Sequence, residues 1–175
     1  MNQKARLLAE IEVTQAQFHQ LLQSIPDEAF GLLSSNPAWT VGELLYHMSI
    51  APRFMVADVK LILQRPFLLK LLPKLFPERL FHWLNARLTR HGARQLNRQF
   101  LADEYDKAHE RILQTLHSLD EADLQKHVHY PDWDPLLAGD VSLDYLFGYI
   151  KRHFDSHAAE IQSSLTLTLS EEGTS

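Results

Sequence analysis

The chain has 175 residues, of which 45% are hydrophobic and 22% are charged, and these proportions exclude a disordered or low-complexity protein. Its net charge of −5 gives no indication of a basic surface that would bind nucleic acid. The lack of cysteine excludes disulfides and thiolate metal sites. No apolar run approaches the ~20 residues that span a bilayer, and the N-terminal residues lack the apolar core of a signal peptide. We therefore expect one cytoplasmic domain over residues 1–169 and a disordered tail over residues 170–175.

Four segments have the apolar spacing of amphipathic helices, with apolar residues recurring every three or four positions. Thr40 and Glu43 form a capping box at the start of the second segment, and Ser142 is a suitable N-cap for the fourth. Residues 120–140 read as a loop, and no pair of strands is evident. The predicted fold class is an all-α four-helix bundle, with helices over residues 4–25, 40–64, 98–118 and 143–165.

Residues 66–95 are a long connection between the second and third helices. The segment is apolar and basic, and Pro77 is placed to open a short helix that Gly92 ends. Apolar surface of this extent usually marks an interface. We expect the segment to cover the bundle as a lid or, preferably, to form a symmetric homodimer, which aspartate at Leu72 and Phe76 would split.

Binding to a membrane surface is an alternative interpretation of the same segment. Lys70, Lys74 and Arg79 are the basic residues among its apolar ones. One or two basic groups per turn on an acidic chain give little attraction to a bilayer, so packing against protein is the preferred interpretation.

Ten histidines are the unusual feature of the composition, and imidazole is the main soft metal ligand that this chain offers. His153 and His157 are four residues apart, which places both on one face of the last helix. About 0.6 such pairs are expected by chance, so the spacing alone is weak evidence. Leu146, Ile150 and Ile161 place the pair on the buried face, where an unpaired polar ring costs about 1–3 kcal/mol.

His47 is the candidate for a third ligand from the second helix. A rise of 1.5 Å per residue puts His47 ~10 Å, His153 ~16 Å and His157 ~22 Å from the starts of their helices. If the two helices are antiparallel, the position of His47 along the bundle axis falls between those of the other two histidines. In a parallel pair, His47 would be displaced along the axis by nearly 10 Å from the midpoint of the other two. The antiparallel case requires an up-down-down-up order with a long crossover, which residues 66–95 supply.

Two short motifs resemble those of the DinB/YfiT-like metalloenzymes. Residues 36–47 contain the pattern Trp-Ser/Thr-x-x-x-hydrophobic-hydrophobic-x-His, and residues 149–161 contain two histidines four apart followed by an aliphatic residue. The resemblance spans about residues 4–165. It implies an up-down-down-up bundle and a divalent metal ion, with zinc expected first and nickel or iron also open, on His47, His153 and His157.

Characterised members of that family include metal-dependent thiol S-transferases, a thiol-dependent isomerase and the iron-binding part of an oxygenase. The resemblance therefore implies an enzyme that transfers a low-molecular-weight thiol to a small electrophile. Three imidazoles leave coordination positions open for water or a thiolate. The alternative is a non-catalytic bundle in which the metal joins two helices and the crossover binds a partner. No catalytic residue is identified.

The remaining polar and aromatic residues are expected mainly in solvent-exposed or packing positions. Asp155 and Glu160 are suited to orient a ligating ring, but we expect both on solvated faces. We expect His109 and His117 on helix surfaces, and Trp39, Trp83 and Trp133 as packing anchors. His127 and His129 are expected in a polar turn, and a position near the mouth of the metal site is the alternative for these two.

Overall fold

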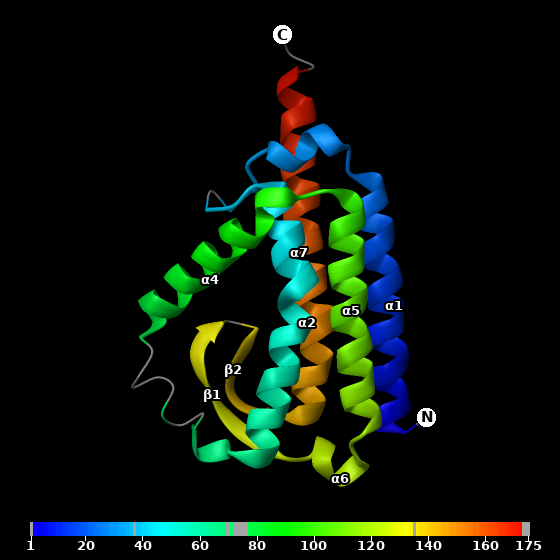
Figure 1. Cartoon of the computed structure of the whole chain (residues 1–175), viewed down its shortest axis with the longest axis vertical. Coiled ribbons are helices and arrows are strands. Elements are labelled where there is room, and N and C mark those ends of the chain that lie inside the picture. The colour runs from blue at the N-terminus through cyan, green and yellow to red at the C-terminus, as the bar shows by residue number, and fades with distance from the viewer. Residues whose placement is uncertain (1, 37, 69–70, 72–76, 135, 173–175) are drawn as a thin grey trace.

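The computed structural model describes residues 2–36, 38–68, 71, 77–134 and 136–172. Four long helices lie side by side and form a bundle (Figure 1). In Figure 1, α1 runs upward from the N-terminus, α2 and α5 run downward, and α7 runs upward. Both α1 and α2 pack against α5 and α7. The predicted all-α bundle with its up-down-down-up order is confirmed, with helices α1 (Gln3–Ser24), α2 (Val41–Gln64), α5 (Arg98–His117) and α7 (Leu143–Glu172).

The starts of α2 and α7 follow the expected capping rules. The Thr40 hydroxyl accepts a hydrogen bond from the Glu43 amide at 3.2 Å, and the Glu43 carboxylate accepts one from the Thr40 amide at 2.9 Å. The Ser142 hydroxyl accepts from the Tyr145 amide at 3.1 Å. Local side chains therefore set where both helices that carry the candidate ligands begin.

The end of α7 differs from expectation. The helix continues beyond residue 165 to Glu172, so three residues of the predicted disordered tail are helical. Residues 173–175 lie outside the described part of the chain. The assignment of residues 1–169 to one domain stays a prediction.

The loop predicted for residues 120–140 is wrong. After the short helix α6 (Glu121–Leu124), β1 (His127–Asp134) and β2 (Leu137–Ser142) form an antiparallel hairpin, with Val128 opposite Val141. Val128 and Val141 are buried in a core cluster with residues of α1, α2, α5 and α7, and the alternate residues His127 and His129 are exposed. The register shifts beyond Tyr130, whose partner Gly139 has φ +78°, a conformation that glycine adopts at little cost.

The crossover contains α4 (Glu78–Gly92) and the short 3₁₀ turn η2 (Ala93–Gln95), which return the chain to the start of α5 (Figure 1). Pro77 is the N-cap of α4 instead of its first residue, and α4 ends at Gly92 as expected. A Cβ atom on Gly92 would lie 2.1 Å from the Tyr46 hydroxyl oxygen, so glycine permits this end of α4 to approach α2. Leu72 and Phe76, the residues expected in a dimer contact, lie outside the described residues.

The N-terminal half of α4 contacts the hairpin through two aromatic rings. Phe81 of α4 and Trp133 of β1 stack with centroids 5.0 Å apart and an interplanar angle of 23°. Trp133 therefore packs as an anchor, as expected, and it joins the crossover to the hairpin. Within the described part of the chain, no helix is long and apolar enough to cross a membrane.

His109 is in the core, so its predicted surface position is wrong. Its side chain is fully buried on α5, its Nδ1–H donates to the Tyr105 carbonyl oxygen at 3.2 Å, and its ring lies 4.0 Å from the Tyr105 ring. Burial lowers the pKa of His109 to about 4. Because α5 packs against both α1 and α2, its buried face is wider than the single stripe read from the sequence.

This buried histidine predicts a loss of stability in acid. The unfolded chain protonates His109 near pH 6.5 and the folded chain only near pH 4, so the free energy of unfolding should fall as pH drops through this window. The loss amounts to about 3 kcal/mol. Replacing His109 with leucine should remove this part of the pH dependence in urea titrations at several pH values. The control is His117→Leu on the exposed end of the same helix, and parallel curves for wild type and His109→Leu would contradict the account.

Candidate metal centre

The antiparallel pair α2 and α7 brings the three predicted histidines together. His47 Nε2 and His153 Nε2 lie 3.0 Å apart, and one ring nitrogen of each histidine lies within 4.8 Å of those of the other two. The ring centroids are 5.0 Å apart for His47 and His153, 5.2 Å for His47 and His157, and 4.5 Å for His153 and His157. A tetrahedral zinc ion sets nitrogen ligands about 3.4 Å apart, so the cluster has the scale of a metal site.

Burial keeps two of these imidazoles neutral. It lowers the pKa of His47 to about 3, with a further contribution from His157, and it lowers the pKa of His153 well below the usual range. Neutral imidazole is the form that binds a metal, because its lone pair is free. Two facing Nε2 atoms also repel unless a proton or a cation lies between them. The donor set and its electrostatics therefore fit a divalent cation.

Glu160 orients the third histidine. Its carboxylate lies 3.1 Å from His157 Nδ1 and accepts that proton, which leaves His157 Nε2 as the nitrogen with a lone pair. The other carboxylate oxygen accepts from the Ser34 hydroxyl at 2.9 Å and from the Asn36 amide at 3.3 Å. The expectation of a solvated Glu160 is wrong, since its side chain is 17% exposed and bonds to the loop before α2. Asp155 pairs with Lys151 on the exposed face, as expected.

Trp39 forms one wall of the cluster. Its ring centroid lies 4.7 Å from that of His47 and 6.3 Å from that of His157. The residue is buried in a core cluster with Phe18, Leu44 and Phe154, which confirms it as a packing anchor. Its indole Nε1 is buried and has no hydrogen-bond partner among the described residues.

A group of polar residues beside His153 was not predicted from the sequence. Tyr149 lies one turn before His153 on α7, with ring centroids 5.4 Å apart, and its hydroxyl donates to the Asp134 carboxylate of β1. Asp58 of α2 is nearby, and burial raises its pKa to about 6, with Tyr130 of β1 as the interacting neighbour. The hairpin supplies Asp134 and Tyr130 of this group, and a loop over residues 120–140 gives no reason to place these two residues beside Tyr149.

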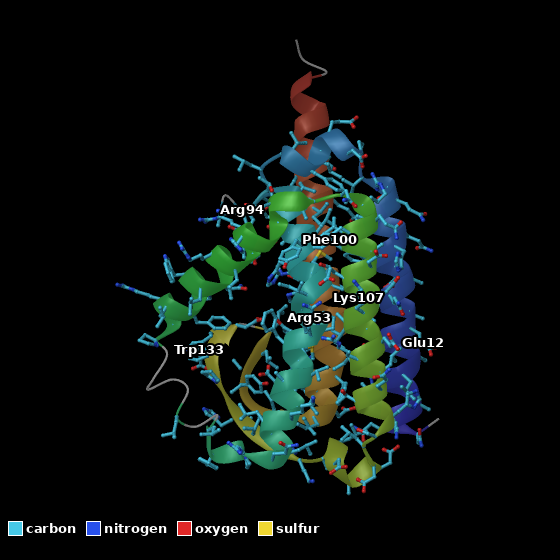
Figure 2. The ribbon with its side chains drawn as sticks, viewed as in Figure 1. Glu12, Arg53, Arg94, Phe100, Lys107 and Trp133 are labelled. Carbon is cyan, nitrogen blue, oxygen red and sulfur yellow. The ribbon has the colours of Figure 1, made fainter. Side chains whose placement is uncertain are left out.

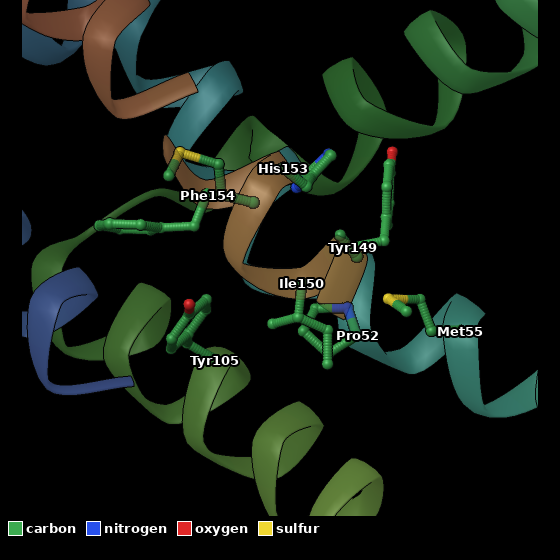
Figure 3. A pocket seen from close by; sticks show the side chains of 9 residues that line it. Pro52, Met55, Tyr105, Tyr149, Ile150, His153 and Phe154 are labelled. Carbon is green, nitrogen blue, oxygen red and sulfur yellow. The ribbon is translucent and has the colours of Figure 1, made fainter. Parts of the chain in front are cut away.

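A small cavity lies behind His153, lined also by Tyr149, Ile150 and Tyr105 (Figure 3). Its volume of about 10 Å³ has room for one water molecule and not for a substrate. Any substrate would therefore reach the histidines from another side.

The comparisons with known proteins agree with this geometry. The family model of the DinB superfamily matches residues 10–161, and the chain belongs to that superfamily. No curated protein gives a significant sequence match.

Two solved structures share the fold. The first is YfiT from Bacillus subtilis, described as "a probable metal-dependent hydrolase with an unusual four-helix bundle topology", with a TM-score of 0.66 and 15% identity over 94% of this chain and 87% of that one. The second is a mycothiol-dependent maleylpyruvate isomerase, with a TM-score of 0.62 and 12% identity over 92% of this chain and 61% of that one. At these identities the two structures establish the fold alone.

The link between the hairpin and α7 predicts coupling between Tyr149 and Asp134. Asp134→Ala leaves the buried Tyr149 hydroxyl without its acceptor and should lower the free energy of unfolding by about 1–3 kcal/mol. Tyr149→Phe removes the donor and should make the Asp134→Ala change nearly neutral. Urea unfolding of the two single variants and the double variant measures the coupling, and strictly additive losses would exclude it.

Proposed function

We propose that this protein is a divalent-metal-dependent enzyme whose ion is held by His47, His153 and His157. The observation that carries the proposal is the convergence of three imidazoles from two antiparallel helices, within 4.8 Å of one another. The description of YfiT as a metal-dependent hydrolase supports it, because YfiT shares the fold. Zinc is the ion that we propose, and nickel and iron are the other candidates for imidazole ligands.

The residues around the histidines each have a role in this proposal. Glu160 holds His157 with Nε2 free to bind a metal, and the burial of His47 and His153 keeps their rings neutral. Trp39 packs beside the rings of His47 and His157, and Tyr149 packs beside the ring of His153. When bound, a divalent ion with three protein ligands supplies an open position at which a thiol or water loses its proton readily.

We propose a low-molecular-weight thiol as the cosubstrate. In the proposed reaction the thiol loses its proton, and the intact thiolate forms a carbon–sulfur bond with a small electrophile, which either releases a leaving group or takes up the proton across an activated double bond. The mycothiol dependence of the maleylpyruvate isomerase supports this choice, because that enzyme shares the bundle. With no cysteine in the chain, the reacting sulfur has to come from a small molecule. The chain would bind and orient the thiolate through the three-histidine centre.

A non-catalytic metal-stabilised bundle is the second candidate. The burial of His153 at 8% exposure and its enclosure by aromatic rings favour a closed site that joins α2 to α7. The homodimer and the cytoplasmic location expected from the sequence stay predictions in either case.

Metal analysis tests the ligand set. Purified protein should carry about one divalent ion per chain, and His47→Ala, His153→Ala and His157→Ala should each remove most of it, because two imidazoles bind far more weakly than three. Glu160→Gln should weaken affinity by about 10- to 100-fold, since it loses the carboxylate that orients His157. His117→Ala is the matched control on an exposed surface. Full occupancy in all three ligand variants would exclude the site.

A cobalt-substituted sample separates the two candidates. If a coordination position is open, addition of a small thiol should change the visible spectrum of the bound cobalt, and activity should appear as thiol consumption with a suitable electrophile. A cobalt spectrum that no thiol or anion changes would indicate a closed structural site and would favour the non-catalytic bundle.

A further inference from the structure

The helix α4 lies at an angle to the bundle (Figures 1 and 2), and Thr89 is the one of its residues that is buried. Phe81, Asn85 and Thr89, spaced one turn apart, form its inner line. The remaining sides of α4 carry the exposed residues. We use the name α4 face for Arg79, Leu80, Trp83, Arg87 and Leu88.

The apolar members of the α4 face are unusually exposed for their size. The exposed fractions are 38% for Leu80, 56% for Trp83 and 55% for Leu88, so the expectation of Trp83 as a packing anchor is wrong. Phe67 and Leu71, in the segment leading to α4, are 60% and 40% exposed. Large apolar side chains gathered in this way mark a surface that is covered by a partner.

The charge of this region defines the chemistry of that partner. Residues 65–95 hold seven of the chain's 17 Lys and Arg residues but one of its 22 Asp and Glu residues. Arg79 and Arg87 belong to the α4 face, and the Arg87 guanidinium lies 5.4 Å from the centre of the Trp83 ring. A strongly basic surface on a chain with net charge −5 selects an anionic partner.

Lys70, Lys74 and Arg79 alone carry too little charge to hold a protein on a membrane surface. The helix α4 adds two more exposed basic residues, Arg87 and Arg90, and the Arg90 guanidinium also donates to the Ala38 carbonyl oxygen at 3.5 Å. This raises the local density of basic groups to the level that attracts acidic headgroups, at about 1 kcal/mol for each.

A second copy of the chain fits this face poorly. In a symmetric dimer the same patch meets itself, so pairing two α4 faces would bring arginines toward arginines. A bilayer with acidic lipids neutralises the arginines and also accepts the leucines and the tryptophan at its interface, where tryptophan is favoured. The helix has 15 residues and cannot cross a bilayer, so it would lie in the plane of the interface.

We propose that the α4 face docks the protein on an anionic phospholipid surface, with Leu80, Trp83 and Leu88 inserted between headgroups and Arg79 and Arg87 paired with phosphates. The protein is peripheral in this arrangement. The histidine cluster is on α2 and α7, so docking leaves the metal ligands in the bundle.

Vesicle flotation tests the proposal with the whole chain. Wild type should bind phosphatidylcholine vesicles that contain phosphatidylglycerol, bind phosphatidylcholine alone weakly, and lose binding as salt rises. Arg79→Gln with Arg87→Gln should weaken binding to the anionic vesicles about 30-fold, and Leu88→Ser about tenfold. Binding should also shift the Trp83 emission to shorter wavelength, a change absent in Trp83→Phe.

Matched controls replace residues of similar exposure elsewhere. Lys60→Gln with Arg111→Gln removes two exposed basic groups from α2 and α5, and Val13→Ser removes a valine that is 52% exposed on α1. Both controls should bind as wild type does. Equal loss in the controls, equal binding to neutral vesicles, or no vesicle binding at all would overturn the proposal. Self-association in sedimentation that Leu88→Ser abolishes, without vesicle binding, would assign the α4 face to a second copy.

Discussion

The fold and the candidate site both depend on the antiparallel packing of α2 against α7. This packing places His47 Nε2 within 3.0 Å of His153 Nε2 in a buried environment, where a proton or a cation has to be shared between the nitrogens. Burial lowers the pKa of both rings, so both are neutral at neutral pH, and the two nitrogens share either the N–H of one ring or a bound cation. A divalent cation satisfies the nitrogens and also ties two helices that are far apart in the sequence.

The same constraint explains the rest of the chain. If α2 and α7 are antiparallel and α5 runs beside α2 in the same direction, the chain has to return along the full length of the bundle after α2. That return is the crossover with α4, which contacts the bundle near Gly92 and the hairpin at Trp133. The hairpin in turn reaches the wall of the site through Asp134 and Tyr149. The crossover and the hairpin, which are distant from the histidines in the sequence, are therefore connected to the histidine cluster through these contacts.

Helical periodicity and rise per residue were sufficient to predict the bundle and to select His47, His153 and His157 from ten histidines. The parts that were missed depend on contacts between distant segments. Glu160 is held by Ser34 and Asn36 from the loop before α2, and no local pattern reveals this. Apolar and polar residues alternate over only a few positions of the hairpin, and β1 contains Pro131, so the sequence pattern that indicates a strand is weak. His109 is buried because α5 contacts two helices at once, which one stripe of apolar residues does not indicate.

The most direct measurement of the central claim is an anomalous difference map from crystals of the protein, collected on both sides of the zinc absorption edge. The account predicts one peak per chain, bounded by His47, His153 and the Nε2 atom of His157, with each nitrogen about 2.0–2.1 Å away. A peak located elsewhere, or a fully zinc-supplemented crystal with no peak between these three rings, would contradict the account.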